Sequence, residues 1–183
     1  MKISQKYYLI VDLEATCADD NSIPRRRMEM IEIGAVLLNS QTLQIESEYQ
    51  TFIKPILHPV LTEFCKSLTS ISQQDIEKAP LFPAALKDFQ SWFYPCGSYL
   101  FCSWGDYDRH QFVQDCQMHG VGYPFPGDHL NLKRAFSSEI NSKKKFGMAG
   151  ALTELGLELE GVHHRGIDDA RNIARIVQTA FSE

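Results

Sequence analysis

The order of strand-like and helix-like patterns along the chain constrains the fold more than any other feature. Three strand patterns come first, the second and third separated by few residues, and helical patterns then alternate with two further strand patterns. Strands joined by short connections favour antiparallel pairing, whereas strands that alternate with helices favour parallel pairing. The order predicts one α/β domain over residues 1–183, with a mixed β-sheet flanked by helices.

Strands are expected where β-branched, aromatic and aliphatic residues cluster, at residues 7–13, 30–39, 44–53, 98–103 and 129–132. Helices are expected where apolar residues recur with helical spacing and caps stand at the ends, at residues 61–68, 72–78, 82–92, 106–119, 148–155 and 167–181. One further helix is expected after residue 132. In the second strand, Ile31 and Ile33 alternate with Glu32 and Gly34, which is typical of a β-strand.

Two carboxylates stand at the end of the first expected strand. Asp12 and Glu14 follow an apolar run, and because strand side chains alternate they point to the same side. Neighbouring carboxylates repel each other unless a positive charge lies between them. The pair is a candidate for binding a divalent cation, and two solvated acids beyond a strand are the alternative.

The other candidates lie further along the chain. Asp169 shares the apolar face of the last helix with Ile173, and a carboxylate aimed inward needs a partner. His164 lies just before this helix, and an imidazole that titrates near neutrality can act as a general base. Asp106 and Asp108 lie where the strand at 98–103 meets the next helix, and one of them could cap that helix.

This inventory of acids and one histidine suits phosphodiester hydrolysis with two metal ions. Oxygen ligands favour Mg²⁺ or Mn²⁺ over zinc. The net charge of −5 argues against a protein that coats nucleic acid electrostatically, although two bound cations would offset about four units of it. Two basic clusters, Arg25–Arg27 and Lys143–Lys145, are either phosphate contacts or solvated loops.

Three segments in this order resemble motifs of the DEDDh 3′–5′ exonucleases, which have a ribonuclease H-like fold. They are Asp12–Cys17, Trp104–Asp108 and His164–Ala170. The chain looks most similar to the branch that contains the 3′ histone-mRNA exonuclease and the enhanced-RNA-interference nucleases. One departure is Ser70, which stands where the branch usually has glycine.

The resemblance implies a set of site residues. Four carboxylates would hold two Mg²⁺ or Mn²⁺ ions and one histidine would be the general base: Asp12, Glu14, Asp108, Asp169 and His164. Backbone at Ala15 and Thr16 would meet the terminal 3′-OH, and Phe64 and Tyr107 would lie against the terminal base. Ordinary core packing is the alternative role for the two aromatic side chains.

The expected activity is 3′–5′ exonucleolytic hydrolysis of single-stranded nucleic acid, with RNA favoured over DNA and nucleoside 5′-monophosphates as products. Two alternatives stay open, a catalytically weak protein that binds 3′ ends and a hydrolase of short oligonucleotides. No apolar run has membrane-spanning length and the start lacks a signal-peptide core, so we expect a cytoplasmic protein. The oligomeric state has no signal in the sequence.

Overall fold

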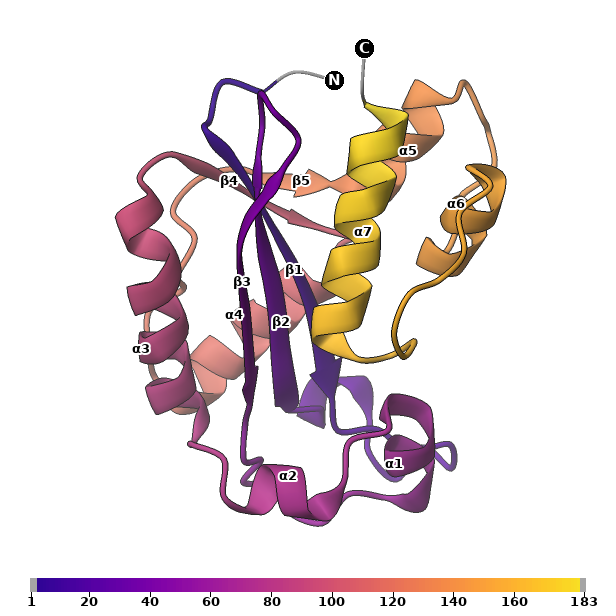
Figure 1. Ribbon diagram of the computed structural model, residues 1–183. Coiled ribbons are helices and arrows are strands. Elements are labelled where there is room, and N and C mark those ends of the chain that lie inside the picture. Colours follow the sequence, from indigo (N-terminus) through magenta and orange to yellow (C-terminus); the bar gives the residue numbers. More distant parts are fainter. Residues whose placement is uncertain (1–2, 182–183) are drawn as a thin grey trace.

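A mixed β-sheet forms the middle layer of the protein (Figure 1). The computed structural model describes residues 3–181, and within them five strands lie in the order β3-β2-β1-β4-β5. The strands are β1 (Tyr7–Ala15), β2 (Met30–Asn39), β3 (Ile45–Phe52), β4 (Tyr99–Ser103) and β5 (His129–Asn131). The first three strands pair antiparallel, whereas β1 with β4 and β4 with β5 pair parallel. The predicted mixed sheet is confirmed.

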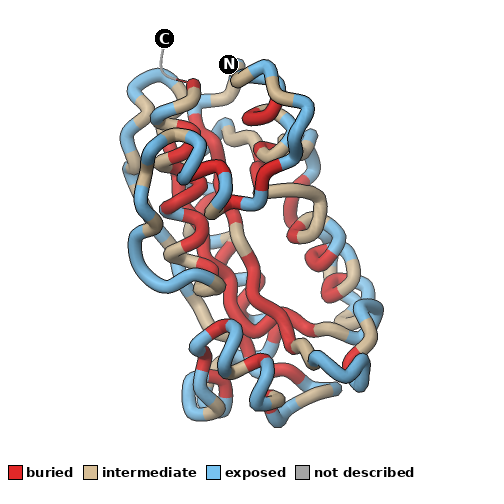
Figure 2. Tube along the Cα trace, turned by 90° about the vertical axis from the view of Figure 1, so that its right-hand side faces the viewer, coloured by how far each residue is buried: buried red, intermediate tan, exposed pale blue. Residues whose placement is uncertain are grey.

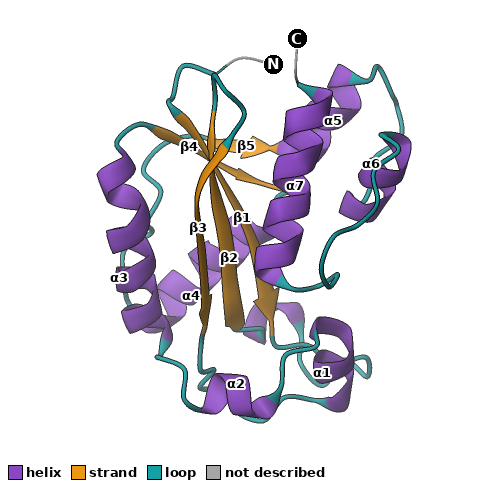
Figure 3. Cartoon of the chain, in the orientation of Figure 1, coloured by secondary structure: helices purple, strands orange, loops and turns teal. Residues whose placement is uncertain are grey.

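Helices cover both faces of the sheet (Figure 3). The helices, with 3-10 helices labelled η, are η1 (Arg25–Arg27), α1 (Glu63–Thr69), α2 (Gln73–Glu77), α3 (Phe82–Phe93), η2 (Tyr94–Cys96), α4 (Tyr107–His119), α5 (Leu132–Glu139), α6 (Met148–Glu154) and α7 (Gly166–Ala180). Helices α3 and α4 pack on one face, where Phe89 and Phe112 join Leu9 of β1. Helices α5, α6 and α7 pack on the other, where Ile173 joins Ile10.

Strand β2 lies between β1 and β3 and is buried on both faces, within the buried centre that Figure 2 shows. Glu32 and Gly34 are as inaccessible as Ile31 and Ile33. The predicted strand at residues 30–39 is confirmed. The alternation does mark two faces, but helix layers cover both of them, so the polar member Glu32 needs partners inside the protein.

Two short helices, α1 and α2, lie beyond the end of the sheet at which β1 finishes (Figure 1). Thr62 caps the N-terminus of helix α1, and its hydroxyl accepts a hydrogen bond from the backbone N–H of Cys65 at 2.9 Å. Ser70 is the C-cap of the same helix and has a left-handed backbone with a φ of 59°. Ser70 thus adopts, with a side chain, a conformation that glycine reaches at least cost. Ser72 caps the N-terminus of helix α2 and forms a reciprocal capping box with Asp75.

No helix within residues 3–181 is both long enough and apolar enough to cross a lipid bilayer.

Candidate active site

Strand β1 ends with two acids on the face that α7 covers. Tyr8 and Ile10 belong to the apolar cluster beneath α7, and Asp12 and Glu14 continue the same alternation. Asp169 lies in the first turn of α7 and is buried. One carboxylate oxygen from each of Asp12, Glu14 and Asp169 lies within 4.8 Å of the others. The fold therefore brings together acids from nearly opposite ends of the sequence.

The position of Asp169 depends on how α7 meets strand β2. Gly34 and Gly166 allow a direct backbone approach, because a Cβ atom added at Gly34 would lie 2.0 Å from the carbonyl carbon of Gly166. The buried carboxylate of Glu32 accepts hydrogen bonds from the backbone N–H of Gly166 at 3.0 Å and from Nε of Arg165 at 3.1 Å. These contacts fix the first turn of α7 against the sheet.

A fourth carboxylate comes from the first turn of α4. Asp108 is buried, and its Oδ1 accepts a hydrogen bond from the backbone N–H of Leu13 at 3.2 Å. Asp106 occupies the N-cap position but makes no capping hydrogen bond with its side chain. It pairs instead with Arg134 of α5 at 2.6 Å. Asp108 therefore faces the acids of β1, whereas Asp106 faces α5.

The pKa values of the four carboxylates are all raised because the groups are withdrawn from water, and those of Asp12 and Glu14 are raised further by neighbouring negative charges. Burial, followed by the charges of Asp108 and Glu14, raises the pKa of Asp12 well above its usual range. Burial and the charge of Asp169 raise the pKa of Glu14 to about 9. Burial also raises the pKa of Asp108 to about 6 and that of Asp169. A cation relieves such repulsion, and these oxygen donors fit a hard divalent ion.

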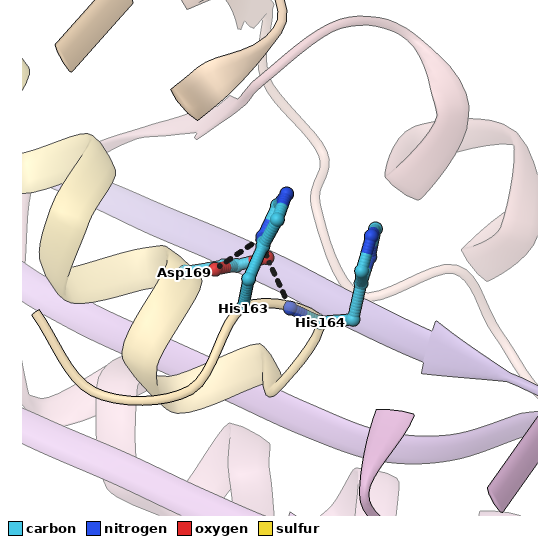
Figure 4. Close-up of side chains that lie close together, drawn as sticks. All are labelled: His163, His164 and Asp169. Atoms are coloured by element: carbon cyan, nitrogen blue, oxygen red, sulfur yellow. Dashed lines mark hydrogen bonds and ion pairs between the residues drawn. The ribbon is translucent and has the colours of Figure 1, made fainter. Parts of the chain in front are cut away.

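Two histidines lie beside Asp169 just before α7 (Figure 4). Nδ1 of His163 lies 3.0 Å from Oδ2 of Asp169, and the backbone N–H of His164 donates to the same oxygen at 3.1 Å. His164 has a φ of 62°, and its ring stacks on that of His163 with centroids 4.0 Å apart. Burial and the charge of His163 lower the pKa of His164, so its ring is neutral near pH 7 and able to accept a proton.

These groups line one cavity of about 360 Å³, a volume in the range of small-ligand sites. The predicted chemical residues all line it: Asp12, Glu14, Asp108, His164 and Asp169. Ala15 and Tyr107 line it as well. Phe64 instead lines a neighbouring cavity and is partly exposed, so it is not a core residue. Thr16 is buried, and its hydroxyl accepts a hydrogen bond from the backbone N–H of Glu29 at 3.0 Å.

Three residues have roles at this site that the sequence patterns did not predict. His163, rather than His164, makes the side-chain contact with Asp169. Arg25 belongs to a basic cluster whose role the sequence left open, and it lines the cavity beside Tyr107. Of the three, only Gly34 could have been identified from the sequence, because an isolated glycine in a strand indicates close approach of another backbone.

The sequence matches a known family of nucleases. The model of the exonuclease family RNase_T matches residues 9–177. Human 3'-5' exoribonuclease 1 is 34% identical over 178 residues, which are 93% of this chain and 51% of that protein. Mouse ERI1 exoribonuclease 3 is 33% identical over 182 residues, which are 94% of this chain and 53% of that protein. The chain spans about half the length of these relatives.

Solved exonuclease structures share the fold. One structure is described as 3'-end specific recognition of histone mRNA stem-loop by 3'-exonuclease. It has a TM-score of 0.89 and 31% sequence identity to this chain, and the match covers 96% of this chain and 63% of that chain. The nuclease domain of 3'hExo, described as a DEDDh family member bound to rAMP, has a TM-score of 0.88 at 30% identity, covering 97% of this chain and 92% of that chain. The predicted ribonuclease H-like fold is confirmed.

Proposed function

This chain belongs to the exonuclease family RNase_T, and we propose that it shortens single-stranded RNA from the 3′ end and releases nucleoside 5′-monophosphates. The observation that carries the proposal is the cluster of Asp12, Glu14 and Asp169, whose oxygens lie within 4.8 Å of one another in a cavity. RNA is favoured over DNA because the similar human and mouse proteins are named exoribonucleases and a similar nuclease domain is described with rAMP.

The exonuclease family depends on divalent metal ions, and the acidic cluster of this chain suits such ions. We propose that Asp12, Glu14, Asp108 and Asp169 hold two Mg²⁺ or Mn²⁺ ions, since carboxylate oxygens are ligands that these ions prefer. The chemistry that such ions supply when bound is a lowered pKa for the attacking water and stabilisation of the leaving oxygen.

His164 is the proposed general base. Its ring stays neutral near pH 7 because burial lowers its pKa, so it accepts a proton from the attacking water. Hydrogen bonding of its backbone N–H to Asp169 and stacking on His163 hold the ring beside the carboxylates. At the substrate end, Ala15 and Tyr107 line the cavity, and we propose that they contact the terminal nucleotide. Contacts from Thr16 and Phe64 stay predictions.

The test follows a single-stranded RNA labelled at its 5′ end, incubated with Mg²⁺ or with EDTA. We expect a ladder of products shortened from the 3′ end, nucleoside 5′-monophosphates on chromatography, and no cleavage in EDTA. Asp108→Asn should lose more than about 100-fold in rate, since it removes a proposed metal ligand. Asp106→Asn is the matched control, because Asp106 pairs with Arg134 away from the cavity.

Three results would contradict the proposal: RNA that binds without being shortened, cleavage that persists in EDTA, or equal rates for the Asp106 and Asp108 variants. A single-stranded DNA of the same sequence, run in parallel, tests the preference for RNA. Equal rates on both polymers would remove the RNA preference and leave the exonuclease activity standing. Substrates from dinucleotides upward measure the shortest strand that the protein accepts.

A further inference from the structure

Arg25 lies over an aromatic ring in the cavity that holds the carboxylates. Its guanidinium carbon is 3.8 Å from the centroid of the Tyr107 ring. Both side chains line the same cavity as Asp108 and Asp169. Arg25 is the first residue of η1, in the connection between β1 and β2, and it is exposed. The stacked guanidinium therefore holds a positive charge beside the proposed cleavage site.

The hydrogen-bond donors of Arg25 have no acceptor in the described part of the chain. Within residues 3–181, no carboxylate lies within 4.0 Å of its guanidinium, and no hydrogen bond leaves its side chain. Burial raises the pKa of Asp108 to about 6, whereas the charge of Arg25 acts to lower it, so the field of Arg25 reaches the carboxylates. A guanidinium that stacks on a ring and lacks an anion is available to a ligand that brings one.

We propose that Arg25 binds a phosphate group of the RNA strand, either at the scissile linkage or at the linkage next to it; this inference rests on the proposed function. RNA brings a negative charge at every linkage, and Asp12, Glu14, Asp108 and Asp169 are themselves acidic. A guanidinium offers paired N–H donors that match phosphate oxygens, and stacking on Tyr107 leaves this edge free. Arg25 supplies an attraction that the carboxylates cannot.

Arg26 and Arg27 make the proposal specific to one side chain. They share the helix η1, the charge and the exposure of Arg25, yet neither lines the cavity. A general electrostatic attraction to RNA would depend on all three arginines alike. A direct contact with a phosphate near the cleavage site depends on Arg25 alone.

The experiment compares kcat/KM of the full chain on single-stranded RNA for wild type, Arg25→Ala, Arg26→Ala and Arg27→Ala. Loss of one charge-assisted contact should lower kcat/KM of Arg25→Ala by about 10- to 100-fold. The two neighbouring variants should stay within about 3-fold of wild type, as expected for exposed charges. Arg25→Lys should recover only part of the loss, because an ammonium does not form the paired contact. Circular dichroism verifies that each variant is folded.

A second set of RNAs identifies the phosphate. A methylphosphonate removes the negative charge from one linkage of the RNA. In one RNA it replaces the scissile linkage, and that RNA is tested as a competitive inhibitor. In the other it replaces the neighbouring linkage, and that RNA is tested as a substrate. The difference between wild type and Arg25→Ala should vanish for the linkage that Arg25 contacts and persist for the other. This result supports the proposal and locates the contact.

Two results overturn the inference while the proposed function stands. One is a wild type that shortens RNA together with an Arg25→Ala variant of equal kcat/KM. The other is a difference between wild type and Arg25→Ala that persists with both modified RNAs, or that Arg26→Ala shows to the same extent. If the wild type itself does not shorten RNA, the proposed function and the role of Arg25 fail together.

Discussion

Gly34 of β2 and Gly166 of α7 meet backbone to backbone, and a Cβ atom added at Gly166 would lie 3.0 Å from the amide nitrogen of Gly34. The same hypothetical atom would lie 3.0 Å from the carbonyl oxygen of Asp12. The first turn of α7, which carries Asp169, is therefore positioned by contact with strands β1 and β2. Side-chain volume at this contact would separate Asp169 from Asp12.

Gly34→Ala is expected to lower both stability and activity. The new Cβ would lie 2.0 Å from backbone atoms of Gly166, so α7 must shift away from β2. Overpacking of this kind costs about 1–3 kcal/mol or more. Thermal unfolding measures the loss of stability, and the RNA assay at a temperature where the variant is folded measures the loss of rate. Gly150→Ala on α6 is the control, since its Cβ would meet nothing closer than 3.9 Å; equal behaviour of the two variants would contradict the prediction.

Glu14→Gln is expected to stabilise the protein in EDTA while abolishing RNA cleavage. The folded pKa of Glu14 is raised from 4.5 to about 9, so its contribution to the stability of the metal-free protein is fully present below pH 4.5 and is lost as pH rises towards and through 9. A neutral amide removes this loss. In EDTA, the thermal unfolding temperature should decrease less between about pH 6 and about pH 8 for Glu14→Gln than for wild type. Glu154→Gln, at an exposed position, should show the same decrease of the unfolding temperature as wild type. If Glu14→Gln also shows a decrease as large as that of wild type, Glu14 is not the cause of the pH dependence.

His164→Ala and His163→Ala are expected to differ in catalysis. Loss of a general base lowers the rate by about 10²- to 10⁴-fold. His163 is exposed and contacts Asp169 through Nδ1, so its loss should leave kcat within about 10-fold of wild type. Because burial lowers the pKa of His164, wild-type activity should persist below the ordinary pKa of 6.5 and fall only at lower pH. A pH–rate profile checks this, and a larger rate loss for His163→Ala than for His164→Ala would reverse the assignment.

Ser70→Gly is expected to stabilise the protein by about 1 kcal/mol, because the left-handed backbone at φ 59° costs about that much for a residue with a Cβ. Ser67→Gly, in the preceding turn of the same helix α1, should destabilise it by about 0.5 kcal/mol, since glycine weakens helix interiors. Urea unfolding of the two variants provides the comparison. A stability change of the same sign in both would show that the backbone conformation of Ser70 is not the cause.

Local patterns predicted the elements that carry the site. The alternation in β1 correctly placed Asp12 and Glu14 on one face, and the helical spacing of Asp169 and Ile173 correctly placed the carboxylate inward. These predictions succeed because strand and helix periodicity fix side-chain directions without knowledge of the rest of the chain. The catalytic and substrate roles of the site residues stay predictions, as does the cytoplasmic location.

Contacts made by residues outside the regular helices and strands could not be predicted from periodicity. The choice between His163 and His164 as the side-chain partner of Asp169 depends on the left-handed φ of His164, which no periodic pattern reveals. The stacking of Arg25 on Tyr107 depends on the path of the connection between β1 and β2. Neither the contact of His163 with Asp169 nor the stacking of Arg25 on Tyr107 lies within one regular helix or strand, so helix and strand periodicity cannot predict them.

The site joins the first strand and the last helix of the described chain, and this matters while the protein is being made. Synthesis proceeds from the N-terminus, so Asp12 and Glu14 leave the ribosome long before His164 and Asp169. A polypeptide synthesised only as far as α6 therefore lacks both the proposed base His164 and the proposed metal ligand Asp169. The proposed cation site is therefore complete only after α7 has been synthesised and has packed against β1 and β2.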